Sequence, residues 1–280
     1  MTPPRYLLAV DMDGTLLRDD KTISDVDAAA IRAAARRGIA VTIATGRLTT
    51  GALPTARALG LTVPLICADG GLLIDCATGA ALERRSIATA HARAALAVME
   101  SHGLVPFVFL ADAIHCDGAG ERYRAVVDTW SRDIVVHDNL AAADAWQGPD
   151  GVSVTAGVGA RSAVESAARD LQRDHAAALD TVHFAMGGLT RWAVRSLPHG
   201  CDKGEMLARL AARLGIPRAR VAAVGDWFND LGMFAFAGRS FAMGQAPDVV
   251  HQAATDRVQA TSATGGGIAE AIEALLASGL

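Results

Sequence analysis

Short apolar runs that end in polar turns dominate residues 1–81. Residues 6–10 (YLLAV), 39–44 (IAVTIA) and 63–68 (VPLICA) are continuous apolar segments, which are typical of strands buried on both faces. Helical patterns separate them, and the first begins with Ser24 and Asp27 spaced as a capping box. This alternation of strand and helix predicts a parallel sheet with crossover helices.

Between about 82 and 189 the pattern changes to paired short strands. Residues 104–110 and 113–116 are spaced as a hairpin, and residues 181–186 face 191–197 across a Gly-Gly turn. These pairs predict an inserted α+β domain with antiparallel strands.

The last part of the chain returns to the first pattern. Lys203 begins a helix, and residues 221–226 (VAAVGD) form another buried-strand pattern. The predicted fold class is therefore α/β: a Rossmann-like parallel sheet with helices on both faces, formed by residues 1–81 and 190–280 and interrupted by the inserted domain at 82–189.

Composition and charge restrict the partners. The chain is 51% hydrophobic and 20% charged, with a formal net charge of −4 and no block of Lys or Arg. Neither a nucleic acid nor an anionic membrane has an electrostatic footprint in such a chain. No apolar stretch approaches about 18 residues, the N-terminus has no signal-peptide pattern, and the four cysteines form no C-x-x-C pair. We therefore expect a cytoplasmic protein, with its oligomeric state open.

Two acidic pairs follow two of the predicted strands. Asp11 and Asp13 come after the first strand, and Asp226 and Asp230 come after the strand at 221–226. Taken alone, each pair is explained by an ordinary capped turn. Together they would meet at one sheet edge, where two charges 4 Å apart repel by about 4 kcal/mol at a dielectric near 20. A hard cation such as Mg²⁺ would remove this repulsion.

Other polar residues at these turns suit an anionic ligand. Thr45 and Gly46 offer a hydroxyl and a backbone N–H at a strand end, which favours a phosphate cradle. Lys203 would be a surface residue in most chains, but its place at a helix start between the acidic motifs favours a functional role. Arg47 either adds positive charge or lies on the surface.

Four segments in this order resemble the motifs of the haloacid dehalogenase superfamily of phosphatases, and specifically its Cof-type branch. They are DMDGTLL (11–17), TIATGR (42–47), Lys203 with Gly204, and GDWFND (225–230). The segments FAMGQAPDVV and GGGIAEAIEAL strengthen the resemblance, which covers essentially the whole predicted core.

The resemblance implies a role for each motif residue. Asp11 would be the nucleophile, and Asp13 would be the acid and then the base. The resemblance assigns Mg²⁺ to the Asp11 carboxylate, the Asp13 carbonyl and Asp226, with Asp230 acting directly or through water. It assigns the phosphoryl oxygens to Thr45, Gly46 and Lys203.

The chain departs from the family pattern at two positions. Asp69 in ADGG stands where the family usually has Asn, and Trp227 replaces a small residue beside Asn229. Asp69 and Asn229 are candidates for supporting contacts. Trp227 either narrows the entrance or stacks on a substrate ring, or it packs against the hinge of the inserted domain.

The implied function is Mg²⁺-dependent hydrolysis of small phosphomonoesters through an aspartyl phosphate, with sugar phosphates as the first candidates. A phosphatase of FMN or pyridoxal phosphate and a phosphomutase on the same core are alternatives. A non-enzymatic phospho-accepting signalling module is a distant one, since such modules are much shorter. The inserted domain is expected to close over the sheet edge and to exclude phosphoproteins and nucleic acids.

Overall fold

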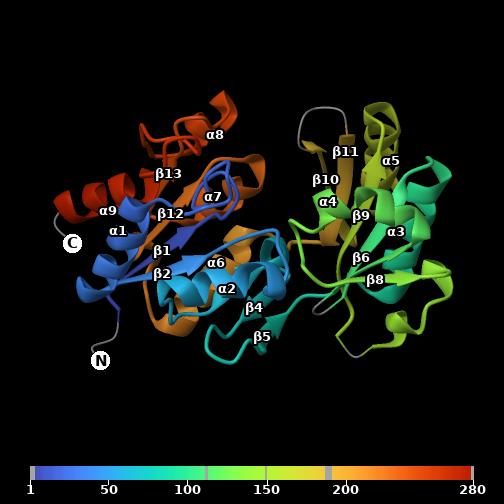
Figure 1. The fold of residues 1–280 in the computed structure, drawn as a ribbon, viewed down its shortest axis with the longest axis horizontal. Coiled ribbons are helices and arrows are strands. Elements are labelled where there is room, and N and C mark those ends of the chain that lie inside the picture. Colours follow the sequence, from blue (N-terminus) through green and yellow to red (C-terminus); the bar gives the residue numbers. More distant parts are fainter. Residues whose placement is uncertain (1–3, 111–112, 149, 187–190, 279–280) are drawn as a thin grey trace. The chain divides into compact units, whose positions relative to one another are not determined.

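The computed structural model of the chain describes residues 4–110, 113–148, 150–186 and 191–278. The chain forms two compact units, which we call unit 1 and unit 2 (Figure 1). Unit 1 comprises Met1–Thr45, Ala52–Leu82 and Asp202–Leu280, and unit 2 comprises Gly46–Gly51 and Glu83–Cys201.

A five-stranded parallel sheet forms the centre of unit 1, in the order β14-β13-β12-β1-β2. Its strands are β1 (Tyr6–Val10), β2 (Ile39–Ile43), β12 (Val221–Gly225), β13 (Arg239–Ala242) and β14 (Asp256–Arg257). In β1, Leu7 pairs with Val221 on one side and with Ala40 on the other. This central position explains why the first predicted strand is apolar throughout.

Helices cover both faces of this sheet. They are α1 (Asp25–Arg36), α2 (Thr49–Leu59), α6 (Lys203–Leu214), α7 (Leu231–Phe236), α8 (Asp248–Ala253) and α9 (Gly267–Ala277). Leu7 and Ala9 belong to the apolar cluster that includes residues of α6 and α7. Leu8 and Val10 point to the opposite face and are also fully buried. Helices α1 and α9 pack against each other (Figure 1).

The third predicted strand is shorter than expected and pairs differently. Strand β3 (Leu65–Cys67) is antiparallel to β4 (Leu72–Ile74) and belongs, with β5 (Ala81–Arg84), to a separate three-stranded sheet. A single parallel bridge between Ala44 and Ile66 links it to the end of β2. Strands β3 and β4 form a hairpin around the turn at 68–71, which apolar periodicity alone does not reveal.

Unit 2 contains a six-stranded sheet in the order β10-β11-β9-β6-β7-β8, in which only β7 and β8 pair in parallel. The strands are β6 (Val105–Leu110), β7 (Ala113–Asp117), β8 (Ile134–His137), β9 (Val152–Gly159), β10 (Leu179–Met186) and β11 (Arg191–Pro198). Both predicted antiparallel pairings are confirmed. The predicted Gly-Gly turn at 187–188 lies outside the described residues.

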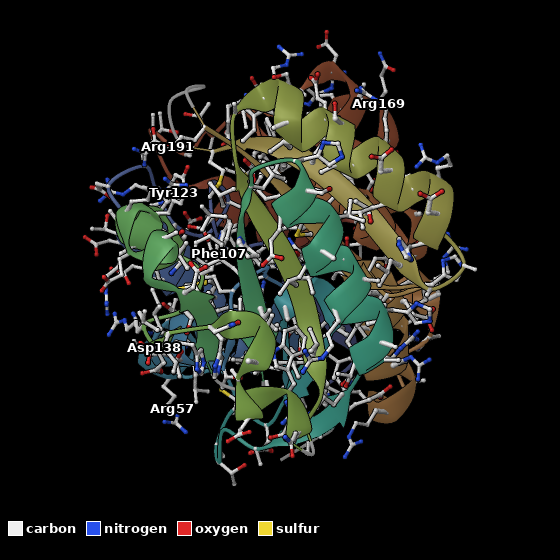
Figure 2. All side chains as sticks on the ribbon, turned by 90° about the vertical axis from the view of Figure 1, so that its right-hand side faces the viewer. Arg57, Phe107, Tyr123, Asp138, Arg169 and Arg191 are labelled. Carbon is white, nitrogen blue, oxygen red and sulfur yellow. The ribbon has the colours of Figure 1, made fainter. Side chains whose placement is uncertain are left out.

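The two faces of the unit 2 sheet differ. Helices α3 (Thr89–Ser101) and α5 (Arg161–His175) pack over an apolar cluster on one face. Phe107 projects from the other face and meets Tyr123 edge to face at 6.5 Å, beside the short helix α4 (Arg124–Val127). The Arg191 guanidinium lies 5.2 Å from the same Tyr123 ring (Figure 2). Among the described residues of both units, no helix combines the length and apolarity needed to cross a membrane.

A buried carboxylate joins the first and last helices of unit 1. Ser24 caps α1 as predicted, because its hydroxyl accepts the Asp27 N–H at 3.1 Å. The Asp27 carboxylate is only 1% exposed, and it accepts the Gly266 N–H at 2.7 Å and the Ala269 N–H at 2.9 Å. Since the first N–H groups of a helix have no intrahelical partner, Asp27 caps α9 from the other end of the chain.

We expect Asp27→Ala to lower the free energy of unfolding by about 2–4 kcal/mol, because it leaves buried N–H groups of α9 without an acceptor. Urea denaturation measures the change. The matched control is Asp25→Ala, an exposed acid in the first turn of α1, which we expect to cost less than about 1 kcal/mol. Equal losses in the two variants would contradict the capping role.

Candidate active site

The carboxyl ends of β1 and β12 bring the two acidic motifs together. These strands are parallel neighbours, with Val10 opposite Val224, so the residues that follow them lie at one edge of the sheet. One carboxylate oxygen each of Asp11, Asp226 and Asp230 lies within 4.8 Å of the others. Three acids from two segments far apart in the sequence therefore form one group, which we call the carboxylate cluster.

Lys203, at the start of α6, carries the ammonium group that holds this cluster. Its side chain is fully buried, and Nζ donates to Asp11 Oδ1 at 2.5 Å and to Asp230 Oδ1 at 2.7 Å. Burying an unpaired ammonium costs several kcal/mol, so these charge-assisted hydrogen bonds compensate its loss of hydration. These two carboxylate partners explain why Lys203 can lie in the interior, whereas most lysines lie on the surface.

The cluster contains more negative charge than Lys203 can neutralise. Burial raises the pKa of Asp11 well above its usual range, and the carboxylates of Asp230 and Asp226 raise it further against the opposing effect of Lys203. Burial and the neighbouring Asp230 raise the pKa of Asp226 to about 6. Burial alone would lower the pKa of Lys203, but the surrounding carboxylates outweigh it and raise that pKa. A divalent cation with oxygen ligands fits this donor set and its surplus charge.

Hydrogen bonds from outside the cluster hold Asp226. Thr15 Oγ1 donates to Asp226 Oδ1 at 3.0 Å, and Gln245 Nε2 donates to Asp226 Oδ2 at 3.4 Å and to the Gly14 carbonyl at 2.6 Å. Neither side chain was a predicted site residue. Thr15 lies inside DMDGTLL, so the motif itself pointed to it. Gln245 lies inside FAMGQAPDVV, where no local pattern indicates a contact with the acids.

Two glycines allow the acids to approach the backbone. Gly14 has φ +88°, and a Cβ at this position would collide with the carboxylate of Asp226. A Cβ at Gly225 would collide with the carboxylate of Asp230. The glycines in DMDGTLL and GDWFND are therefore required by the packing of the cluster.

Asp13 lies outside the carboxylate cluster in the structure. Its side chain is 38% exposed and accepts a hydrogen bond from Lys21 Nζ at 3.2 Å. Lys21 has a left-handed backbone, with φ 65°, in the turn that follows the first motif. Asp13 thus has the solvent access that a group exchanging protons needs, whereas Asp11 is 5% exposed.

Thr45, Asp69 and Asn229 connect three turns of unit 1. Thr45 is 1% exposed, and its carbonyl accepts the Asp69 N–H at 3.0 Å. Asp69, with φ 49°, accepts a hydrogen bond from Asn229 Nδ2 at 3.0 Å. The Asp at position 69 therefore acts as an acceptor that ties the turn after β3 to the turn after β12.

Gly46 and Arg47 belong to unit 2, so the border between the units falls inside the TIATGR motif. The Gly46 carbonyl accepts a hydrogen bond from Arg195 Nη2 at 3.3 Å, and Arg47 Nη1 donates to the Gly51 carbonyl at 3.4 Å. Arg195 is 5% exposed, and its guanidinium lies 5.4 Å from the Phe109 ring and 5.5 Å from the Trp130 ring. We did not predict Arg195 as a site residue, since it is 149 positions from Gly46 in the sequence and only the fold brings the two together.

A parallel α/β sheet with clustered carboxylates and a buried lysine at its carboxyl edge has the parts of a phosphoryl-transfer enzyme. Residues 8–272 match the model of the haloacid dehalogenase-like hydrolases, and the chain belongs to that family.

The chain is similar to named phosphatases over most of its length. It is 30% identical over 268 residues to 5-amino-6-(5-phospho-D-ribitylamino)uracil phosphatase YwtE of Bacillus subtilis (strain 168), covering 89% of this chain and 91% of that protein. It is 26% identical over 255 residues to pyridoxal phosphate phosphatase YbhA of Escherichia coli (strain K12), covering 87% and 89%. A solved haloacid dehalogenase-like hydrolase from B. subtilis has a TM-score of 0.82 and 25% identity, covering 96% of this chain and 99% of that one. The predicted family, α/β fold class and phosphatase activity class are confirmed.

The pKa of Asp226 generates a prediction for the metal-free protein. Because this pKa is about 6 in the folded protein and about 3.9 in an unfolded chain, the folded state binds the proton more tightly between these values. The free energy of unfolding in excess chelator should therefore increase by about 1 kcal/mol from this carboxyl as pH falls from about 7.5 to 5. Urea denaturation at several pH values measures it. In Asp226→Asn the increase should shrink by that amount, and identical pH slopes would contradict the assignment.

Proposed function

We propose that the protein is a Mg²⁺-dependent phosphatase that hydrolyses small phosphomonoesters through an aspartyl phosphate on Asp11. The observation that carries the proposal is the buried Lys203 between Asp11 and Asp230, beside the third carboxylate of Asp226. Phosphoryl transfer depends mainly on positioning and on neutralising the phosphoryl oxygens. A site with several carboxylates can bind a phosphate only if cations offset the repulsion between the negative charges. The Lys203 ammonium is one such cation, and it belongs to the chain itself.

The proposed reaction has two halves that restore both acids. First, a carboxylate oxygen of Asp11 attacks phosphorus, the bond from phosphorus to the substrate oxygen breaks, and Asp13 donates its proton to that oxygen. Then Asp13 takes a proton from water, the water oxygen bonds to phosphorus, and the bond between phosphorus and Asp11 breaks. Inorganic phosphate leaves, Asp11 is again a carboxylate, and Asp13 is again protonated.

Other residues have holding roles in this proposal. Asp11, Asp226 and Asp230 would hold Mg²⁺ together with the Asp13 carbonyl, and their oxygen donors and surplus negative charge support this assignment. When bound, Mg²⁺ supplies positive charge that neutralises and orients the phosphoryl oxygens. Lys203, Thr45 and Gly46 would hold those oxygens, while Asp69 and Asn229 support the turns; Arg47 either adds charge or lies on the surface.

The proposed substrates are small phosphorylated metabolites. Sugar phosphates are the first candidates from the sequence, with FMN and pyridoxal phosphate next, and two similar proteins are named for a uracil derivative and for pyridoxal phosphate. A phosphomutase would return the phosphoryl group to a second hydroxyl and release no phosphate. A cytoplasmic location is part of the proposal, supported by four buried cysteines that are thiols rather than disulfides, of which Cys67 has its pKa raised to about 12 by burial.

Asp11→Asn should lower phosphate release by at least about 10³-fold, because the amide keeps the shape but removes the nucleophilic oxygen. Asp19→Asn is the matched control, since Asp19 is an exposed acid of the following turn and should keep wild-type turnover. Steady-state release of inorganic phosphate gives the rates, and circular dichroism verifies the fold. Wild-type turnover by folded Asp11→Asn protein would refute the proposed chemistry.

A panel of phosphomonoesters tests the metal and the substrate class together. We expect no phosphate release in excess chelator and full recovery with added Mg²⁺. The panel contains hexose and pentose phosphates, FMN, pyridoxal phosphate, nucleotides and a phosphopeptide, and kcat/KM should be highest for the small metabolites. Full activity in chelator would contradict the metal site. A preference for the phosphopeptide would contradict the substrate class, and a rearranged sugar phosphate without free phosphate would reveal a mutase.

A further inference from the structure

Two exposed aromatic side chains stand in the turn that carries the carboxylate cluster. Trp227 and Phe228 directly follow Asp226, and they are 42% and 47% exposed. Their rings meet edge to face, with centroids 5.2 Å apart and planes at 81°. Large apolar side chains left open to water beside a reactive site are typical of a surface that a ligand covers.

Hydrogen bonds fix the backbone of Trp227 relative to the cluster. The Trp227 N–H donates to Asp230 Oδ2 at 3.0 Å, and the Asp230 N–H donates back to the Trp227 carbonyl at 3.0 Å. Asp230 itself is fully buried and bonded to Lys203. The Trp227 backbone is therefore hydrogen-bonded to the Asp230 carboxylate, which also accepts a hydrogen bond from the buried Lys203.

The polar side chains of the same turn already have partners within unit 1. Asp226 accepts from Thr15, Asn229 donates to Asp69, and Asp230 accepts from Lys203. A sugar ring carries hydroxyls around its rim that need hydrogen-bond partners, whereas a heteroaromatic ring offers a flat face that needs only stacking. Apart from the cluster, this turn therefore offers a ligand the aromatic side chains of Trp227 and Phe228.

We propose that Trp227 and Phe228 form a stacking platform that selects phosphomonoesters whose organic part is a planar heteroaromatic ring. The inference rests on the proposed phosphatase function of Asp11, and it names the preferred substrate class. The two similar phosphatases named for a uracil derivative and for pyridoxal phosphate support it. An aromatic pair contributes up to about tenfold in affinity beyond its buried area.

The experiment compares Trp227→Leu, which keeps an apolar side chain but removes the ring, with Trp227→Phe, which keeps a ring. We expect Trp227→Leu to lower kcat/KM about tenfold for pyridoxal phosphate and FMN, mainly through KM, and less than about twofold for glucose 6-phosphate. Trp227→Phe should retain most of the preference. The control is Val249→Ala, since Val249 is a 54% exposed apolar residue of α8 in the same unit and should change neither rate.

A second measurement does not depend on turnover. FMN bound to Asp11→Asn protein should show flavin fluorescence quenched by stacking, and the quenching should be lost in Asp11→Asn/Trp227→Leu. The platform would be overturned if Trp227→Leu lowered kcat/KM equally for all substrates or left the preference among them unchanged. Equal quenching of flavin fluorescence in Asp11→Asn and Asp11→Asn/Trp227→Leu would also overturn it. If the wild-type protein releases phosphate from no substrate, the proposed function fails, and the fluorescence comparison still decides whether the platform binds rings.

Discussion

The burial of one ammonium group is the constraint on which the site depends. Lys203 can lie in the interior only if carboxylates receive its hydrogen bonds, and Asp11 and Asp230 do so at 2.5 and 2.7 Å. Those acids come from the ends of β1 and β12, so the two strands must be parallel neighbours with both motifs at one edge. Helix α6 must likewise begin at that edge. The burial of Lys203 therefore constrains both the strand order of the sheet and the chemistry of the site.

The same cluster creates a surplus of negative charge that is costly without a ligand. Burial and mutual repulsion raise the pKa of Asp11 and of Asp226, and both effects weaken when a cation enters. The carboxylate cluster without a ligand therefore lowers the stability of the folded protein, and a divalent cation would relieve this cost. In the proposed function, Lys203 and a bound cation would offset the chain's net charge of −4 when an anionic ester binds.

Rigidity and the proposed substrate selectivity come from different parts of the site. Thr15, Gln245 and the glycines at 14 and 225 hold the acids in place and leave little room for variation. The Trp227 and Phe228 side chains belong to the same turn but remain 42% and 47% exposed. In our proposal, substrate specificity therefore depends on exposed positions that can change while the cluster stays unchanged.

The sequence by itself determined the strands at 6–10 and 39–44, the order of the four motifs, and the meeting of the acids at one sheet edge. These features follow from local periodicity and from the rule that ligands bind at the carboxyl ends of parallel strands. Only the tertiary structure decided that Asp27 caps α9, that Gln245 holds Asp226, and that Gly46 groups with unit 2. Each of these facts depends on a contact between residues of different elements, and apolar patterns record burial but not the partner that provides it.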